Sequence, residues 1–393
     1  MDNKEIFYRH LAPTSPHPVG LEVAHAAGSI ITTTDGRQYY DLIAGIGVAN
    51  VGHRHPQVVA AIKEQLERHA HVMVYGEYIQ QPVSALAARL TALLPATLDC
   101  VYLVNSGTEA NEAAIKLAKR VTGRFKVVAF KGGYHGNTQG SLSVSGNESK
   151  KQAFRPLIPG TVFLPFNELA SLDVIDSNTA AVIMEPIQGD AGVVIPNQAF
   201  MEAVRQRCTD SGALLIFDEV QTGIGRSGRL FAFEHYGVAP DILTLAKGLG
   251  GGLPIGAFVS SYQNMQQLAH DPMLGHITTF GGNPLCSAAA TAVLDIVTTP
   301  GFLDEVEKKG ALLEKLLQHC QVKAIRRKGL MLAIELESEE KVDKAIRLAL
   351  ERGVIIYWFL STRHCFRISP PLTITQQEIE AAADILQEVF DLL

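Results

Sequence analysis

The amino-acid sequence predicts an α/β protein whose main part is a mostly parallel sheet covered by helices on both faces. From residue 82 onward, short continuous apolar runs, which are typical of strands buried on both faces, alternate with helical segments. After Pro284 the strands become shorter and the helices more exposed, which indicates a second, smaller α/β unit. We therefore expect an N-terminal arm at 1–45 that packs with the small unit, a large unit at 46–285 and the small C-terminal unit at 286–393.

Each element follows from its local pattern of apolar, turn and helix-breaking residues. Residues 1–45 are expected to be a loose arm followed by strand pieces, because Pro13, Pro16 and Pro18 interrupt its start. In the large unit, helices are expected at 56–69, 82–94, 107–121 and 197–210, and strands at 100–104, 127–130, 161–164, 180–184, 213–217, 242–246 and 255–259. In the small unit, helices are expected at 285–297, 301–319, 339–352 and 375–391, and strands at 330–336, 353–357 and 365–369.

Composition narrows the class of protein. Hydrophobic residues make up 47% of the chain and charged residues 19%, as in ordinary globular proteins. The net charge of −6 gives no sign of a nucleic-acid or membrane-surface partner. Five cysteines form no close pairs and argue against a disulfide framework, so the cytoplasm is the expected compartment. No signal peptide and no apolar run of about 18 residues is found, so we expect no membrane segment.

Lys247 stands at the end of the predicted strand 242–246. Five of the seven residues after it are Gly or Pro, which break regular structure and let other groups approach closely. Burial at such a place lowers the pKa of a lysine amine, and a neutral amine is what a Schiff base with an aldehyde requires. The alternative is a lysine that extends from the strand end into solvent.

Two further strands of the same sheet end in acidic residues. The strand 213–217 leads into Asp218, Glu219 and Gln221, and the strand 180–184 leads into Glu185. Because ligands bind at the carboxyl ends of strands in doubly wound sheets, these side chains are expected to meet in one crevice. A single acid at such a position is more often a turn former or a helix cap.

Two loops complete the pattern. Ser106, Gly107 and Thr108 begin a helix directly after a strand, where free backbone N–H groups suit a phosphate. Tyr134 stands among glycines and could stack on a planar ring; plain helix capping and a surface-loop tyrosine are the alternatives. A lysine, an acid, a phosphate cradle and an aromatic ring together suit pyridoxal 5′-phosphate (PLP), and we expect no metal site.

The chain resembles the class III (fold type I) PLP-dependent aminotransferases over essentially its full length, and most of all their acetylornithine and ornithine aminotransferase branch. The resemblance is carried by the stretches 105–112, 184–189, 216–226, 245–256, 278–285 and 367–372. It implies a seven-stranded, mainly parallel sheet in the large domain and a homodimer with shared active sites. It also implies that the cofactor is held by Ser106, Gly107, Thr108, Tyr134, Glu185, Asp218, Gln221, Lys247 and Thr279.

The resemblance also implies roles for the catalytic pair. Lys247 would carry the cofactor and move the proton, and Asp218 would pair with the ring nitrogen. Gln221 would bond the phenolic oxygen of the ring, and Glu185 would support the site from beneath. Thr279 would reach the phosphate of the cofactor in the neighbouring subunit.

The substrate residues implied by the resemblance are Asn137, Asp190, Thr278 and Arg367. Arg367 would hold an α-carboxylate, and Asp190 occupies the place of a glutamate that masks this arginine when a cationic donor binds. Asn137 departs from the pattern, since the family carries an arginine there that grips a substrate carboxylate. Losing such a contact costs about 1.5–3 kcal/mol per hydrogen bond to charge.

These features predict an aminotransferase that moves the terminal amine of an ornithine-like donor, such as acetylornithine, to a keto acid such as 2-oxoglutarate. Because of Asn137, a different ω-amine or diamine donor is an alternative. A PLP aminomutase and a decarboxylating relative are further alternatives within the fold. A non-catalytic descendant is disfavoured because Lys247 and Asp218 are both present.

Overall fold

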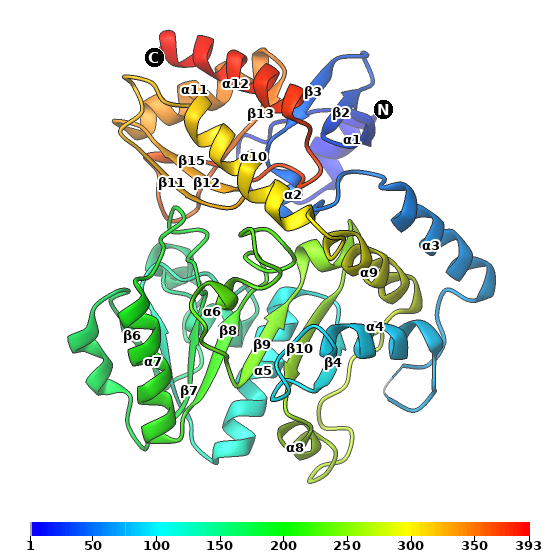
Figure 1. Cartoon of the computed structure of the whole chain (residues 1–393), viewed down its shortest axis with the longest axis vertical. Coiled ribbons are helices and arrows are strands. Elements are labelled where there is room, and N and C mark those ends of the chain that lie inside the picture. The colour runs from blue at the N-terminus through cyan, green and yellow to red at the C-terminus, as the bar shows by residue number, and fades with distance from the viewer. Residues whose placement is uncertain (1, 75) are drawn as a thin grey trace.

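The largest element of the fold is a seven-stranded sheet (Figure 1) in the computed structural model, which describes residues 2–74 and 76–393. Its order is β4-β10-β9-β8-β7-β5-β6. Only β10 runs antiparallel to its neighbours, and the other described pairs are parallel, so the predicted mainly parallel sheet is confirmed. The strands are Cys100–Val104 (β4), Gly256–Ser260 (β10), Ile242–Leu245 (β9), Leu214–Asp218 (β8), Thr179–Met184 (β7), Lys126–Phe130 (β5) and Thr161–Leu164 (β6).

Both faces of this sheet are covered, and this explains its continuous apolar strands. In β7, Ala181 and Ile183 pack into the cluster formed with α5, whereas Val182 and Met184 pack into the cluster formed with α4, α7 and α9. Successive residues of a strand point to opposite faces, so a strand between two helical layers has no polar side. The helices are Pro56–Arg68 (α3), Gln81–Thr91 (α4), Gly107–Thr122 (α5), Gln198–Ser211 (α7) and Pro284–Val297 (α9).

The C-terminal part forms a separate four-stranded sheet, drawn in golden yellow to orange in Figure 1. Its order is β11-β12-β15-β14, with the strands Ala324–Lys328, Met331–Glu335, Cys365–Ile368 and Tyr357–Trp358. Its apolar face packs against the helices Phe302–Leu316 (α10), Glu339–Glu351 (α11) and Gln376–Asp391 (α12).

The N-terminal arm joins this part through backbone pairing. β3 (Gln38–Asp41) pairs in parallel with β13 (Val354–Ile355), which extends the sheet begun by β1 (Val23–Ala27) and β2 (Ile30–Thr33). The expected strand 353–357 is therefore divided, because Val354–Ile355 joins the arm whereas Tyr357–Trp358 pairs with β15.

The other predicted helices and strands after residue 45 lie within three residues of their expected bounds. Besides several short helices and turns, two longer elements were missed. The helix Asn3–His10 (α1) buries no side chain and begins with a capping box at Asp2, so it carries little apolar periodicity. β11 carries two arginines and a lysine and lacks a continuous apolar run.

The remaining short elements are the helices Ala44–Gly47 (α2), Gln139–Val144 (α6) and Tyr262–Met265 (α8), and the 3₁₀ turns Glu148–Lys150, Gln152–Phe154, Leu169–Val174, Ala232–His235, Lys247–Gly250 and Gln266–Leu268. Within the described ranges, no single helix has both the length and the apolar character needed to cross a bilayer. α9 and α10 meet those criteria only when they are taken together, and they are bent by 74° at the break between them.

Candidate active site

A cavity of about 470 Å³ lies at the carboxyl ends of the central strands. Asp218 ends β8, Lys247 follows β9, Glu185 follows β7, and α5 begins just after β4. Parallel strands present their carboxyl ends at one edge, so residues far apart in the sequence meet here. Of the residues expected from the sequence, the cavity is lined by Ser106, Gly107, Thr108, Tyr134, Asn137, Glu185, Asp218, Gln221 and Lys247.

Asp218 is buried and held by hydrogen bonds on both carboxylate oxygens. Oδ1 accepts from the Val220 amide at 3.0 Å, and Oδ2 accepts from Asn111 Nδ2 at 2.7 Å. His135 Nδ1 lies 2.8 Å from the same Oδ2, and Thr244 Oγ1 donates to Asn111 Oδ1 at 2.8 Å. These contacts fix the orientation of the carboxylate.

The sequence analysis did not identify Asn111 and His135 as partners of Asp218. Asn111 is a polar residue on the buried, alanine-rich face of α5, and this was the available signal. His135 stands in the same glycine loop as Tyr134, but its sequence gives no indication that it reaches the acid that ends β8.

The Lys247 amine opens onto the cavity. Burial lowers its pKa; the nearby Asp218 carboxylate raises it and the Arg367 guanidinium lowers it, with burial the largest effect. The backbone of Lys247 has φ +44°, which L residues rarely adopt. The lowered pKa, and not the backbone conformation, favours the neutral, nucleophilic form of the amine.

The start of α5 provides the anion cradle. Ser106 caps the helix by accepting from the Glu109 amide at 3.3 Å, and the first turn leaves backbone N–H groups without intrahelical partners. A Cβ on Gly107 would lie 2.7 Å from Val220 Cγ1, so only glycine fits there. Thr108 Oγ1 lies 2.6 Å from Ser141 Oγ, which fixes that hydroxyl at the rim of the cavity.

Glu185 supports the floor and the aromatic residue. Its Oε1 accepts from the Tyr134 amide at 3.0 Å and its Oε2 from the Gly189 amide at 2.9 Å. Burial raises the pKa of Glu185 to about 7. Tyr134 remains 40% exposed, so its ring is available to cover a ligand. Gly189 leaves room for Gln221, because a Cβ there would lie 2.5 Å from Gln221 Oε1.

Arg367 and Asp190 form a second buried centre beside the cavity. Arg367 Nη2 donates to Asp190 Oδ1 at 3.0 Å, and its Nε donates to the Trp358 carbonyl at 3.0 Å. Asp190 also accepts from the Leu360 amide at 2.8 Å and from Ser361 Oγ at 2.7 Å. The acid therefore fixes both the arginine and the loop before β15.

Thr278 and Thr279 do not line the cavity within one chain. Thr278 Oγ1 accepts from Asn105 Nδ2 at 2.8 Å and faces a separate hollow of about 200 Å³ together with Tyr78 and Leu103. Thr279 follows directly, away from the Lys247 cavity of the same chain.

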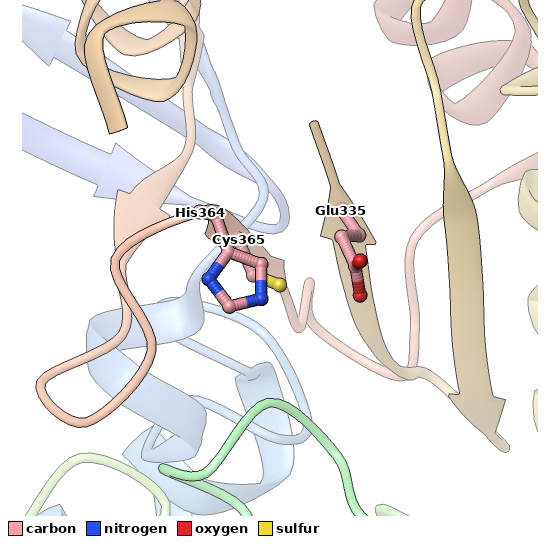
Figure 2. A group of neighbouring side chains, drawn as sticks. All are labelled: Glu335, His364 and Cys365. Carbon is pink, nitrogen blue, oxygen red and sulfur yellow. The ribbon is translucent and has the colours of Figure 1, made fainter. Parts of the chain in front are cut away.

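Figure 2 shows a third group of ligand-type side chains, Glu335 and the neighbouring pair His364 and Cys365. Their ligand atoms lie within 4.8 Å of one another. The guanidinium of Arg326 already lies among them, with Nη1 2.5 Å from Glu335 Oε2 and Nη2 3.1 Å from Cys365 Sγ. The Arg326 guanidinium thus already occupies the place that a cation would take, and we interpret the cluster as structural.

Glu219 is buried behind the site and gives a prediction about stability. Its carboxylate accepts from the Ala232 and Phe233 amides at 2.6 and 2.8 Å, and burial raises its pKa to about 8. Between the ordinary carboxyl pKa and this value the folded state binds more protons than the unfolded state, so the free energy of unfolding falls as pH rises. The expected loss from pH 5 to 8 is on the order of 4 kcal/mol.

Glu219→Gln should therefore flatten the decline in stability over this pH range. Urea unfolding at pH 5 and pH 8 would measure the effect, with the exposed Glu202→Gln as the control. The decline that remains in the Glu219 variant should reflect Glu185. Parallel pH profiles for the variant and the native protein would show that Glu219 is ionised throughout.

The residues around the cavity fit PLP by their chemistry. The amine of Lys247 suits its aldehyde, the fixed Asp218 carboxylate suits its ring nitrogen, and the amide-rich start of α5 suits its phosphate. The glycine at 107 lets the first turn of α5 pack closely against Val220, another residue of the cavity wall.

Comparisons with known proteins agree with this chemistry. The profile of the aminotransferase class-III family matches residues 11–390. The acetylornithine aminotransferase of Mycobacterium leprae (strain TN) is 41% identical over 379 residues, which cover 94% of this chain and 91% of that protein. The acetylornithine aminotransferase of Methanopyrus kandleri is 40% identical, with 100% and 99% covered.

Solved structures with the same fold bind PLP. The ornithine aminotransferase from Toxoplasma gondii, in which PLP partially occupies the active site, has a TM-score of 0.91 and 30% identity, covering 98% of this chain and 92% of that chain. The PLP-bound amine transaminase from an uncultivated Pseudomonas species has a TM-score of 0.90 and 29% identity, with 98% of each chain covered. This protein therefore belongs to the class-III aminotransferase family, whose fold, PLP cofactor and transamination chemistry it shares.

Proposed function

We propose that this aminotransferase takes the terminal amino group of an ornithine-like donor, acetylornithine being the leading candidate, and passes it to a keto acid such as 2-oxoglutarate. The observation that carries the proposal is the placement of Lys247 and Asp218 in one cavity beside the buried Arg367–Asp190 pair. Relatives about 40% identical over nearly the whole chain, named acetylornithine aminotransferases, support the same donor.

The chain's own residues divide the work. When bound, PLP supplies an aldehyde for the amine and a ring that withdraws electrons from the reacting carbon. With PLP bound, Lys247 Nζ would act as the general base that takes the proton from the substrate carbon and as the general acid that gives it to the former aldehyde carbon of the cofactor. Asp218 would keep the ring nitrogen protonated, Gln221 would bond the phenolic oxygen, and Tyr134 would cover the ring. Ser106, Gly107 and Thr108 would hold the phosphate, and Glu185 holds the Tyr134 loop from below.

The Arg367–Asp190 pair distinguishes between the keto acid and the amino donor. A keto acid brings a carboxylate that replaces Asp190 as the partner of Arg367. A donor with a cationic terminal amine brings no carboxylate to Arg367, and the Arg367–Asp190 ion pair remains intact. Because Asp190 also holds Leu360 and Ser361, opening the pair would move the loop before β15 as well.

The donor is tested at Asn137, which lines the cavity where the family carries an arginine. Asn137→Arg should lower the KM for acetylornithine about tenfold or more, because the guanidinium adds a charged hydrogen bond to the donor carboxylate. Initial rates with 2-oxoglutarate and with pyruvate would measure this, and a diamine without a carboxylate is the control donor.

An unchanged KM for acetylornithine in this variant would contradict the proposed place of the donor carboxylate. High native turnover with a diamine instead would identify that compound class as the donor. Turnover without any added keto acid would indicate the aminomutase reaction.

A homodimer is the proposed assembly, and an exposed apolar patch supports it. Ile79 is 98% exposed, Met273 78% and Phe280 57%, and the ring centroids of His71 and Phe280 lie 5.1 Å apart. Val74, Tyr78 and Thr278 line one hollow, so the segments 71–74, 76–80 and 278–280 lie together and include Thr279. A second copy seated there would bring Thr279 towards the phosphate of the facing cofactor.

The cytoplasm is the proposed compartment, supported by five free cysteines. We also propose the division into an arm at 1–45, a PLP-binding domain at 46–285 and a small domain at 286–393. The pairing of β3 with β13 supports the assignment of the arm to the small domain.

A further inference from the structure

Arg226 is a completely buried arginine that joins the two main parts of the chain. It stands eight residues after Asp218 and reaches two segments of the C-terminal part. Its Nη1 donates to the Leu330 carbonyl at 2.8 Å and to the Pro370 carbonyl at 2.6 Å. Leu330 directly precedes β12, and Pro370 lies just beyond the end of β15. One guanidinium thus holds β15, the strand that carries Arg367, and its neighbour β12.

Asn50 connects the same guanidinium to the turn that carries Lys247. Asn50 Oδ1 accepts from Arg226 Nη2 at 2.7 Å, and Asn50 Nδ2 donates to the Ile224 carbonyl at 2.8 Å. A Cβ on Gly248 would lie 2.3 Å from Asn50 Nδ2, so the amide packs directly on the residue after Lys247. The Asn50 carbonyl accepts from the Leu372 amide at 2.7 Å.

The turn that carries Arg226 packs tightly against the turn at Gly329 and Leu330. The Leu330 amide donates to the Arg226 carbonyl at 3.1 Å. Gly329 has φ +56°, and a Cβ there would lie 2.4 Å from the Ser227 carbonyl carbon. Backbone therefore packs on backbone, and small shifts of Arg226 are passed directly to the start of β12.

Burying the charge of Arg226 costs free energy, because the guanidinium loses its hydration. The three acceptors that receive its hydrogen bonds are all uncharged oxygens, and burial lowers its pKa to about 9. A buried charge is often replaceable by an apolar side chain without loss of stability. The feature that an apolar side chain could not reproduce is the fixed set of three directional bonds.

We propose that Arg226 is a positioning residue that sets the place of Arg367 relative to Lys247, and thereby the affinity for the carboxylate of the keto acid. Arg367 lies on β15 opposite Ala333 of β12. Arg226 bonds the Pro370 carbonyl just after β15 and the Leu330 carbonyl just before β12, so it holds one end of each of these two strands. The inference rests on the proposed function, because it takes Arg367 as the carboxylate anchor.

The test compares Arg226→Met with a matched control in the PLP-loaded enzyme. Arg226→Met should raise the KM for 2-oxoglutarate on the order of 10- to 100-fold, because displaced binding groups lose alignment. The kcat should change less than about threefold. Arg124→Met is the control, since Arg124 also donates to two carbonyls, of Thr179 and Ser211, but at the far end of the sheet. It should lower stability and leave the KM unchanged.

Arg226→Lys carries the test if Arg226→Met does not fold, because lysine keeps the charge and can replace only part of the three bonds. Its KM should lie between those of the native enzyme and the methionine variant. Hydrogen exchange gives a readout independent of activity. The amides of Leu330 and Leu372 should exchange faster in the Arg226 variants and at the native rate in the Arg124 variant.

A double-mutant cycle with Arg367→Ala separates this inference from the proposed function. In the Arg367→Ala background, Arg226→Met should raise the KM no further. If Arg367→Ala alone leaves the KM for 2-oxoglutarate unchanged, the anchor assigned to Arg367 is wrong and the inference falls with it. If Arg367→Ala raises the KM but Arg226→Met raises it no more than Arg124→Met does, only the inference about Arg226 is overturned.

Discussion

Lys247→Ala is expected to abolish transamination, with turnover lower by about 10⁴-fold or more. The variant loses both the amine that binds the cofactor aldehyde and the base that moves the proton. Its fold should persist, because alanine removes no hydrogen bond that holds β9 in the sheet. The absorbance of the protein-bound cofactor and single-turnover rates with a donor would measure the loss.

A matched control separates this effect from a general loss of lysine. Lys126 begins β5 at the opposite edge of the sheet, where its Nζ lies 2.7 Å from Asp176 Oδ1. Lys126→Ala should keep both the absorbance band and the turnover. If the Lys247 variant retained the characteristic band, a different amine would carry the cofactor.

Asp218→Asn is the second large change, with an expected loss in kcat on the order of 10³-fold. A neutral amide cannot hold a proton on the ring nitrogen, so the ring accepts electrons less well. The amide would also place an N–H₂ group near Asn111 Nδ2 or the Val220 amide, which donate to the carboxylate in the native protein. Steady-state rates and the dissociation constant of PLP would measure both effects.

Asp241→Asn is the control for this prediction. Asp241 is an aspartate at the opposite end of β9, where its Oδ2 accepts from Arg205 Nη1 and the Leu215 amide at 2.9 and 2.7 Å. Its replacement should affect stability and leave kcat unchanged. Equal losses in the two variants would mean that the Asp218 effect comes from folding alone.

The sequence was sufficient for most of the large sheet, and the reason is physical. A strand buried on both faces has no polar side, so β7, β8 and β9 stand out as short apolar runs. The polar residues that end those runs then locate the cavity, because parallel strands share an edge. The roles of Gln221, Thr279 and Arg367 came from the family resemblance, since their local sequence carries no chemical signal.

Other parts required the folded chain. The bond between Asn111 and Asp218 joins residues 107 positions apart, and that between His135 and Asp218 joins residues 83 apart. No local pattern reports such pairs. The division of 353–357 between two sheets was likewise invisible, because each half finds its partner strand in a different part of the chain.

The left-handed backbone at Lys247 has a consequence for engineering this enzyme. Its φ of +44° costs an L residue about 1–2 kcal/mol relative to glycine. A screen that rewards thermal robustness alone would therefore enrich glycine at position 247 and discard activity. At position 247, therefore, the chemistry of the site and not the stability of the fold decides the residue.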